Sequence, residues 1–233
     1  MEDLFSKLIS DKKLTINDDP FLVENFIDIK KYISWDVLND AINSNIVYWE
    51  IIGHDGKKID IPFKEPFWFK GHQQQNKSFI KDYVNAGYTF VISRSSVLNN
   101  NLKLITSAIQ KTFHVSADIH IYGSKGGSGS FGPHADMPAN FIIQIEGETE
   151  WVVFKNKVSN MLSLYHRDDN FNNLDPMLEH RAKPGDLIYV PSRYYHCALP
   201  NSPRLSISIP CFNPMEDEVN RLQTDTNIYN ING

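Results

Sequence analysis

The chain has 233 residues, of which 41% are hydrophobic and 22% are charged, a balance typical of a soluble globular protein that buries a core. Its 23 basic and 28 acidic side chains give a net charge of −5, and the basic ones are scattered. This pattern argues against a nucleic-acid-binding protein. The N-terminus lacks the basic and apolar regions of a signal peptide, and no apolar run is long enough to span a membrane. We therefore expect a cytoplasmic protein whose partners include neither nucleic acid nor a membrane.

The chain contains two cysteines, Cys197 and Cys211. Two cysteines in a chain of this length do not indicate a disulfide scaffold, and a reducing compartment is the simpler interpretation. We expect both to be small buried hydrophobic side chains.

The first half of the chain shows mainly helical periodicity, with a few strand patterns between the helices. In chain order we expect a helix within residues 1–19, a strand over 21–27, a helix from Trp35, a hairpin of strands 46–52 and 59–63, a helix over 78–86 closed by Gly87, a strand over 88–92, and a long helix from Ser95 or Ser96 to about Phe113.

The second half shows mainly strand patterns, predicted over residues 115–122, 141–145, 151–154, 161–165, 187–190 and 205–209. Residues 167–179 are expected to form a polar surface loop between strands. Helices followed by closely spaced strands indicate an α+β fold with a double-stranded β-helix (jelly-roll, cupin-like) core. We expect one domain over residues 1–212, in which an N-terminal region (residues 1–114) packs on a barrel (residues 115–212), and a short C-terminal tail over residues 213–233.

Two motifs in the second half contain metal-binding side chains. The first, FGPHADMPAN, is predicted to include a strand that carries His134 and Asp136. Residues i and i+2 of a strand point to the same side, so both can bind one metal ion. The second motif, KPGDLIYVPSRYYH, contains a turn and a short apolar strand, and it reaches His196 about sixty residues after Asp136.

Two imidazoles and one carboxylate on one side of a metal form the facial triad of non-haem Fe(II) oxygenases, which leaves positions open for dioxygen and a co-substrate. His134, Asp136 and His196 are therefore candidate metal ligands and catalytic residues. An H-x-D pair alone is a weak signal. Its combination with the second motif favours a metal-binding cupin-like protein.

Other residues receive structural interpretations. His120 alternates with two isoleucines and is expected to point into the barrel, whereas His54 and His72 are expected in loops. Residues 123–132 contain five glycines, but the Lys-Ser/Thr ending of a phosphate-binding loop is missing. We interpret them as a mobile loop beside the mouth of the site that could cover bound substrate.

With these motifs placed, the chain resembles the JmjC/cupin-type Fe(II)- and 2-oxoglutarate-dependent oxygenases, and within them the small bacterial hydroxylases and ribosomal oxygenases. The resemblance runs over roughly residues 20–212. It begins with PFLVENFID, and its specific parts are residues 134–154 (HADMPANFIIQIEGETEWVVF) and 183–196 (KPGDLIYVPSRYYH).

The resemblance implies that His134, Asp136 and His196 bind Fe(II) and that 2-oxoglutarate is the co-substrate. Asn140 matches a position where some relatives carry an Asn that reaches the co-substrate or an iron-bound water; the alternative is a hydrogen bond at a strand end. Ser206 and Ser208 lie on the last barrel strand, where relatives place small polar residues facing the pocket; the alternative is that each satisfies a strand edge.

One departure from the family pattern concerns the co-substrate. Relatives usually carry Lys or Arg on the strand after the Glu-Gly turn, paired with the distal carboxylate of 2-oxoglutarate, and here that position is Thr149. A buried carboxylate without a cation partner is costly. Arg204, which begins an R-x-S sequence and shares strand parity with the two serines, is the best replacement, and Lys125 is a weaker one.

We therefore expect an Fe(II)/2-oxoglutarate-dependent dioxygenase that hydroxylates a C–H bond of a protein or peptide side chain, with demethylation as the same chemistry on an N-methyl carbon. One alternative is a metal-dependent cupin dioxygenase or isomerase that acts on a small molecule without 2-oxoglutarate. Another is a non-catalytic metal-binding cupin. The oligomeric state is left open, with a homodimer as one option.

Overall fold

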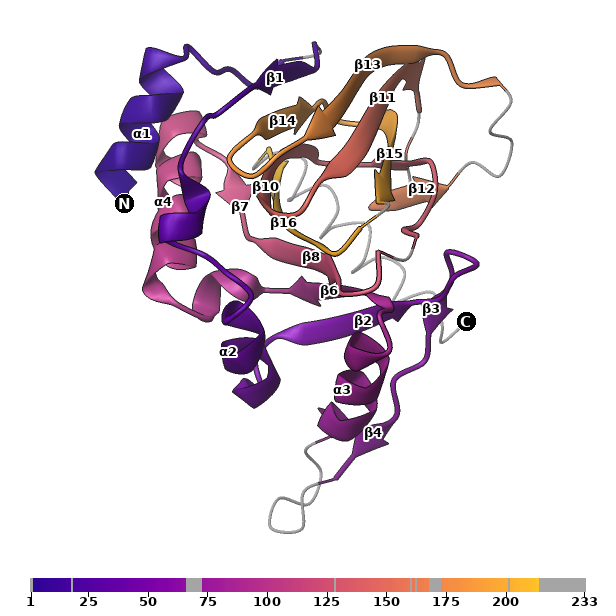
Figure 1. The fold of residues 1–233 in the computed structure, drawn as a ribbon. Helices are drawn as coiled ribbons and strands as arrows, with labels where there is room; N and C mark the ends of the chain where they lie inside the picture. Colours follow the sequence, from indigo (N-terminus) through magenta and orange to yellow (C-terminus); the bar gives the residue numbers. More distant parts are fainter. Residues whose placement is uncertain are drawn as a thin grey trace, which may run out of the picture.

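The chain folds around two antiparallel β-sheets that face each other and form a double-stranded β-helix (Figure 1). The computed structural model describes residues 2–17, 19–65, 73–127, 129–159, 161, 163–167, 173–200 and 202–213. Apolar side chains from both sheets meet in one buried cluster, with Ile142 and Ile188 from one sheet and Trp151 and Val153 from the other. The α+β jelly-roll expectation is thereby confirmed.

The larger sheet contains nine strands. In spatial order they are β1 (Phe21–Val23), β14 (Leu187–Val190), β10 (Ala139–Glu146), β16 (Arg204–Phe212), β8 (His120–Ser124), β6 (Thr89–Ser93), β2 (Tyr48–Ile52) and β3 (Lys58–Ile59), while β7 (Ser116–Ala117) pairs with β16. Strands from both halves of the chain thus belong to one sheet.

The smaller sheet contains five strands and holds the residues of the H-x-D motif. Its order is β12 (Tyr165–Arg167), β9 (His134–Asp136), β15 (Tyr194–Pro200), β11 (Thr149–Lys157) and β13 (Pro176–Ala182). A separate pair is formed by β4 (Phe63–Lys64) and β5 (Gln74–Gln75).

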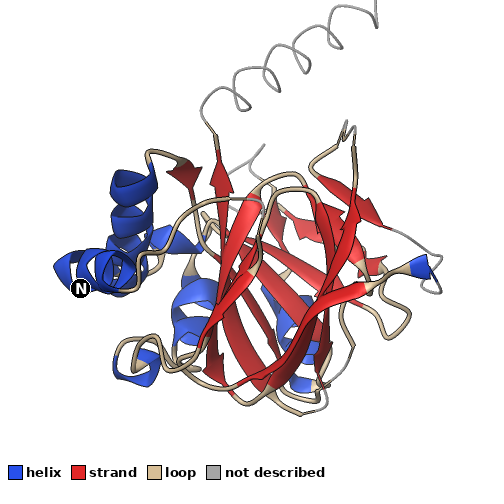
Figure 2. Ribbon diagram, turned by 90° about the horizontal axis from the view of Figure 1, so that it is seen from above, coloured by secondary structure: helices blue, strands red, loops and turns tan. Residues whose placement is uncertain are grey.

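The helices cover the outer face of the larger sheet (Figure 2). They are α1 (Glu2–Asp11), α2 (Val37–Asn43), α3 (Lys77–Asn85) and α4 (Asn100–Phe113), with short 3-10 turns η1 (Ile29–Lys31) and η2 (Ser95–Val97). In Figure 1, α1 and α4 lie side by side, and α3 lies against β2. Their apolar faces form one buried core with the outward side chains of the sheet. None of the described helices is long and apolar enough to cross a membrane.

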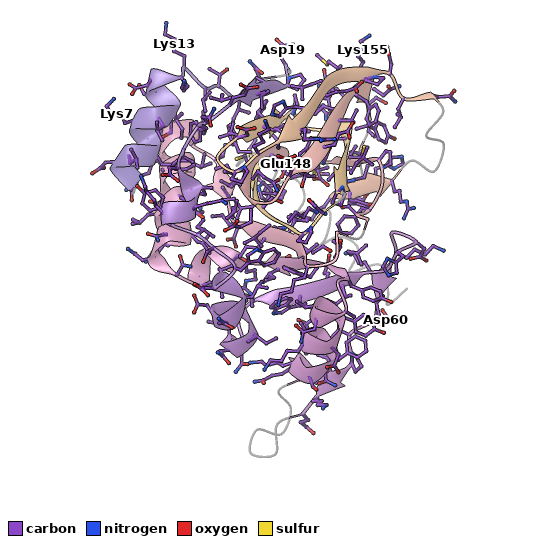
Figure 3. The ribbon with its side chains drawn as sticks, in the orientation of Figure 1. Lys7, Lys13, Asp19, Asp60, Glu148 and Lys155 are labelled. Atoms are coloured by element: carbon purple, nitrogen blue, oxygen red, sulfur yellow. The ribbon has the colours of Figure 1, made fainter. Side chains whose placement is uncertain are left out.

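Strand alternation decides which side chains enter the barrel. On β10, Phe141 and Ile143 point toward the helices and belong to the core beneath them. On β16, Ile207 does the same. Because successive residues of a strand face opposite sides, the intervening residues of these strands, among them Asn140, Gln144, Arg204, Ser206 and Ser208, face the barrel interior. The interior therefore contains polar groups, whereas charged side chains such as Lys7, Lys13 and Lys155 lie at the periphery (Figure 3).

Most of the predicted elements are confirmed, with shifts of a few residues at their ends. The helices expected in 1–19, from Trp35 and over 78–86 correspond to α1, α2 and α3, and the hairpin corresponds to β2 and β3. The strands expected over 88–92, 141–145, 151–154, 187–190 and 205–209 correspond to β6, β10, β11, β14 and β16.

The long helix expected from residue 95 to 113 is interrupted. Residues 95–97 form η2, and α4 then begins anew because Asn99 caps it: the Asn99 Oδ1 atom accepts a hydrogen bond from the Leu102 amide at 3.1 Å. An Asn side chain that bonds to the backbone in this way favours a helix start over a helix interior.

Several other expectations are wrong in some respect. The strand predicted over residues 161–165 begins only at Tyr165, as β12. The loop predicted over 167–179 contains the start of β13, which pairs with β11. The strand predicted over 21–27 ends at Val23. The N-terminal region (residues 1–114) contributes β1, β2, β3 and β6 to the same sheet as the barrel strands. His72 and the tail beyond residue 213 lie outside the described residues.

Replacing the helix cap tests the interruption at residue 99. We expect Asn99→Ala to lower the free energy of unfolding by about 1 kcal/mol, because the first turn of α4 loses its side-chain acceptor. Urea denaturation measures this change. Asn100→Ala, an exposed substitution one residue further along, is the matched control and should change the free energy by less than about 0.5 kcal/mol. Equal effects of the two substitutions would contradict the capping role.

Candidate active site

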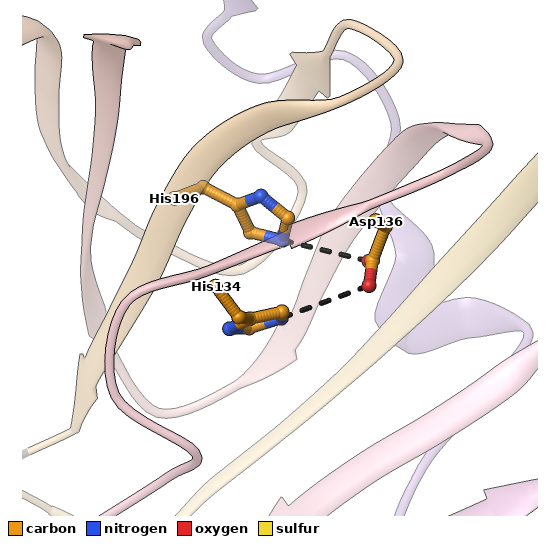
Figure 4. Close-up of side chains that lie close together, drawn as sticks. All are labelled: His134, Asp136 and His196. Atoms are coloured by element: carbon orange, nitrogen blue, oxygen red, sulfur yellow. Dashed lines mark ion pairs between the residues drawn. The ribbon is translucent and has the colours of Figure 1, made fainter. Parts of the chain in front are cut away.

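Strands β9 and β15 bring the two motif histidines together. The strands are antiparallel neighbours, and their register places His134 directly opposite His196. Asp136 lies two residues after His134 on the same side of β9 (Figure 4). Its carboxylate oxygens lie 4.0 Å from the His134 Nε2 atom and 3.6 Å from the His196 Nε2 atom. Among the described residues, these three side chains form a group of potential metal ligands within 4.8 Å of one another.

Backbone carbonyls fix the orientation of both imidazoles. The His134 Nδ1 atom lies 2.8 Å from the Gly132 carbonyl oxygen, and the His196 Nδ1 atom lies 3.0 Å from the Tyr194 carbonyl oxygen. A carbonyl oxygen only accepts hydrogen bonds, so each Nδ1 donates its proton, and Nε2 is the ring nitrogen that faces the other two residues of the triad. Metal-binding histidines are commonly oriented by this kind of hydrogen bond.

Asp136 is held by a chain of hydrogen bonds that begins inside the barrel. The Ser208 hydroxyl donates to the Asn140 Oδ1 atom at 3.1 Å, and the Asn140 Nδ2 atom donates to Asp136 Oδ2 at 3.1 Å. Asn140, at the start of β10, therefore orients the carboxylate, which agrees with the alternative of a hydrogen bond at a strand end; a contact with the co-substrate stays a prediction. Ser208 faces the interior, as the family resemblance implies, and supports Asn140.

The electrostatics of His196 suit a metal ligand. Burial, and after it the neighbouring His134, lowers the pKa of His196 to about 4, so its imidazole is neutral at physiological pH. Two imidazoles and one carboxylate with open space beside them are a donor set suited to a divalent metal such as Fe(II). The residues present therefore fit the metal that the facial-triad pattern predicts.

A second group of polar side chains lies further inside the barrel, around Arg204. The Arg204 side chain is 1% exposed, and its Nε and Nη2 atoms have no hydrogen-bond partner among the described residues. Burial lowers its pKa to about 10, so the guanidinium remains charged at neutral pH. A buried charge without a partner is strongly unfavourable. The position is therefore suited to an anion supplied from outside the chain.

Thr149 lies near the same end of the barrel and is fully buried, with no hydrogen-bond partner for its Oγ1 atom among the described residues. The turn before it touches β16 closely: a Cβ atom on Gly147 would lie 3.2 Å from the Arg204 Cα atom. The nearby Gln144 Oε1 and the Trp151 Nε1 also lack partners in the described portion of the chain. These buried side chains, which we call the inner polar cluster, have hydrogen-bonding capacity that a polar ligand could satisfy.

Ser206 lies between Ser208 and Arg204 on the inner side of β16 and is 1% exposed. Asn140 on β10 connects the triad to Ser208, and the inward side chains of β16 continue from Ser208 through Ser206 to Arg204. A carboxylate-containing co-substrate such as 2-oxoglutarate fits this arrangement, with one end at the metal ligands and the other at the guanidinium. Lys125, the weaker cation candidate, is an exposed residue.

In front of the triad lies a cavity of about 390 Å3. His134, Asp136 and Asn140 line it from the side of the metal site. The larger sheet contributes Glu50, Lys58, His120 and Tyr122, and aromatic walls come from Phe131, Tyr165 and Phe212. His120 therefore faces the pocket, as its alternation predicts, and burial lowers its pKa. A cavity of about 480 Å3 beside Phe113 and Tyr189 lies on the helical side of the sheet and does not include the triad.

The glycine-rich stretch is explained partly by close packing. A Cβ atom added at Gly126 would lie 2.9 Å from the Gly87 Cα atom. A Cβ atom added at Gly127, where φ is +66°, would lie 2.8 Å from the Ser202 amide nitrogen. Both positions therefore require glycine, because any side chain there would collide with the backbone of Gly87 or Ser202. Phe131, just beyond them, contacts His134 with ring centroids 5.8 Å apart.

Both cysteines are buried and free. Burial raises the pKa of Cys197 to about 11 and raises that of Cys211 further. Neither thiol is therefore suited to act as a nucleophile, and the structural interpretation of both residues is confirmed.

A family model described as the JmjC domain matches residues 95–219, which is more than half of the chain. The chain therefore belongs to the JmjC-domain family. The matched region begins at η2 and includes the three triad residues and Arg204.

Solved structures share the fold. A ribosomal oxygenase of Escherichia coli, YcfD, is 18% identical with a TM-score of 0.61, over 89% of this chain and 51% of that chain. The same protein in complex with cobalt and 2-oxoglutarate is 21% identical with a TM-score of 0.57, over 88% of this chain and 51% of that one.

Curated relatives share a portion of the sequence. The bifunctional lysine-specific demethylase and histidyl-hydroxylase NO66 of Dictyostelium discoideum is 27% identical over 135 residues, which are 57% of this chain and 26% of the relative. Human ribosomal oxygenase 1 is 30% identical over 95 residues, which are 40% of this chain and 15% of the relative. The chain thus spans about half the length of the solved structures and about a quarter or less of these curated relatives.

Metal binding tests the role of Asn140. We expect Asn140→Ala to weaken Co(II) binding about 10- to 100-fold, because Asp136 loses the group that orients its carboxylate. Asp136→Ala should remove measurable binding. Calorimetric titration with Co(II) gives the affinities, and Asn39→Ala on the exposed face of α2 is the matched control. An Asn140→Ala variant that binds Co(II) like the control would show that the hydrogen bond does not position the ligand.

Proposed function

We propose that this protein is an Fe(II)- and 2-oxoglutarate-dependent oxygenase that hydroxylates a C–H bond in a side chain of a protein or peptide. The observation that carries the proposal is the combination, in one barrel, of a triad of metal-binding side chains with a buried Arg204 whose Nε and Nη2 atoms have no hydrogen-bond partner among the described residues. The first fits a metal ion and the second fits the distal carboxylate of the co-substrate.

Iron bound at this triad would supply the activation of dioxygen, coupled to oxidation of 2-oxoglutarate to succinate and CO2, with one oxygen atom entering the substrate C–H bond. His134, Asp136 and His196 would hold the ion through one side of its coordination sphere. Asn140 and Ser208 keep the carboxylate in place. The protein's own contribution is therefore orientation of the ligands and of the organic co-substrate.

Arg204 would bind the co-substrate by charge-assisted hydrogen bonds from Nε and Nη2, which can contact a carboxylate in a bidentate manner. Thr149 offers a hydroxyl donor near Arg204, and Ser206 lies between Ser208 and Arg204 on β16. Both ends of this region are shielded from water: His196 is 3% exposed and Arg204 is 1% exposed. Exclusion of water strengthens the electrostatic interactions there and limits side reactions.

An enzyme that works without 2-oxoglutarate is the second candidate, and Thr149 is the residue that favours it. The position that is usually basic in relatives is not basic here. Arg204 can replace the missing basic residue, because it is a buried cation on β16 in place of one on β11. An anaerobic titration of the Fe(II)-loaded protein with 2-oxoglutarate separates the two candidates, because only direct chelation of iron produces a visible charge-transfer band.

The substrate proposal rests on the cavity in front of the triad and on the relatives. The relatives' names refer to histidyl and lysine side chains and to the ribosome. The cavity is bordered by half-exposed side chains, among them Tyr165, which is 38% exposed, and Leu164, which is 56% exposed. A site that opens at such a surface is accessible to a side chain that remains attached to a polypeptide. The two free cysteines support a reducing compartment, the cytoplasm, as its location.

Arg204→Met separates the co-substrate role from a structural one. Methionine fills much of the same space without the charge, so we expect the affinity for 2-oxoglutarate to fall about 30-fold or more. The thermal stability of the protein without co-substrate should stay equal or rise, because an unpartnered buried charge is removed. Anaerobic titration gives the affinity, and calorimetric melting gives the stability.

The control for this experiment is Arg181→Met, which removes an exposed guanidinium on β13 and should leave the affinity for 2-oxoglutarate unchanged. If Arg204→Met binds 2-oxoglutarate as tightly as the control does, the clamp lies elsewhere. If the unsubstituted protein binds iron but shows no charge-transfer band at saturating 2-oxoglutarate, the co-substrate proposal is wrong.

A further inference from the structure

The outer region of the cavity is lined by a carboxylate that the metal site does not use. Glu50 lies on β2, and its side chain is 22% exposed. The sheet register pairs Glu50 with Val91, Val91 with Tyr122, and Tyr122 with Ser206. These four residues form one row across the larger sheet, on the face that continues into the barrel. Glu50 therefore points to the same side of the sheet as Ser206 and the inner polar cluster.

The charges that line this cavity are few. Besides the triad, the described lining residues contribute one carboxylate, Glu50, and one lysine, Lys58. The Lys58 Nζ atom lies 2.6 Å from the Glu50 Oε1 atom, but the lysine side chain is 61% exposed. Ion pairs with one exposed partner contribute little to stability. A second cation that enters the cavity can therefore replace Lys58 at low cost.

Aromatic rings surround the space between Glu50 and the triad. Phe131 packs on Val91 and Tyr122, next to Glu50, and its ring centroid lies 5.9 Å from that of Tyr165. Tyr165 in turn lies 5.0 Å from His134. Aromatic faces attract the ammonium group of lysine and the guanidinium of arginine, and they also pack against the aliphatic portion of these side chains. The walls and the carboxylate thus favour the same kind of guest.

We propose that Glu50 selects the substrate by binding the charged end of a long basic side chain, arginine or lysine, in a polypeptide, and that Lys58 holds this position until the substrate displaces it. This inference rests on the proposed function, because it identifies the substrate of the same site. Glu50 and Asp136 line one cavity from different sheets. A side chain whose charged end contacts Glu50 therefore places its aliphatic carbons in the cavity beside the triad.

Binding of peptides that differ in charge at one position tests the proposal without turnover. Four fluorescent peptides with randomised flanking residues carry arginine, citrulline, lysine or norleucine at the centre. Citrulline and norleucine closely match the size of arginine and lysine without the charge. The full chain is loaded with Mn(II) and 2-oxoglutarate without dioxygen, and fluorescence anisotropy gives the affinities. We expect the two basic peptides to bind about tenfold more tightly than their neutral counterparts.

Two substitutions assign this preference to the ion pair. Glu50→Gln should remove the difference between basic and neutral peptides. Lys58→Met should strengthen binding of the basic peptides severalfold and leave the neutral ones unchanged, because the competing cation is gone. The matched controls are Glu179→Gln on the exposed side of β13 and Lys57→Met, next to Lys58, and both should behave like the unsubstituted protein.

The outcomes distinguish this inference from the proposed function. Equal binding of charged and neutral peptides, or binding of none of the four, overturns the role of Glu50, as does a preference that persists in Glu50→Gln. The same peptides are then incubated with Fe(II), 2-oxoglutarate and dioxygen, and mass spectrometry detects the addition of one oxygen atom. Charge-dependent binding through Glu50 without any oxidised product would support the inference and contradict the proposed oxygenase activity.

Discussion

The pairing of His134 with His196 across β9 and β15 is the contact on which the site depends. Strand β9 has three residues, and a shift of its register by one residue would turn both His134 and Asp136 to the opposite face. Backbone bonds prevent such a shift: the Arg193 amide donates to the Asp136 carbonyl at 2.7 Å, and the Met137 amide donates to the Leu164 carbonyl at 3.0 Å. The neighbouring strands on both sides therefore hold the triad in place.

The inner polar cluster destabilises the protein without ligand and becomes stabilising when a ligand binds. Within the described part of the chain, a buried guanidinium and several polar atoms lack hydrogen-bond partners, which destabilises the protein without its ligand. A ligand that satisfies them stabilises the folded state by mass action. The family pattern places the cation on β11, where this chain has Thr149. The turn before Thr149 touches the start of β16 at Pro203 and Arg204, so a cation on β16 lies near the position that is basic in the family pattern. A change in the position of the clamp is therefore compatible with an unchanged fold.

The sequence was sufficient to predict the jelly roll and the triad, because strand alternation and motif spacing are local properties. It was insufficient for β13, because the sequence PMLEHRA does not show the regular hydrophobic alternation of a half-buried strand, although burial in the folded strand does alternate from Met177 to Ala182. The role of Asn140 depends on a turn that brings its amide back to Asp136, which the sequence does not reveal. Glu50 was missed because its place in the cavity depends on the pairing of β2, β6 and β8, strands that are far apart along the chain.

Glu50 in the cavity is negatively charged, and Arg204 in the inner polar cluster is positively charged. Their positions along the sheet affect where each proposed ligand can bind. Arg204 lies deep in the barrel and Glu50 lies near its mouth, at opposite ends of a run of inward-facing side chains. An anion that stops near Glu50 meets a like charge, and a cation that passes the metal meets Arg204. Such repulsive contacts contribute to specificity as much as attractive ones do. The same sheet face that builds the site would therefore direct a dicarboxylate inward and keep a basic side chain at the entrance, where a polypeptide can present it.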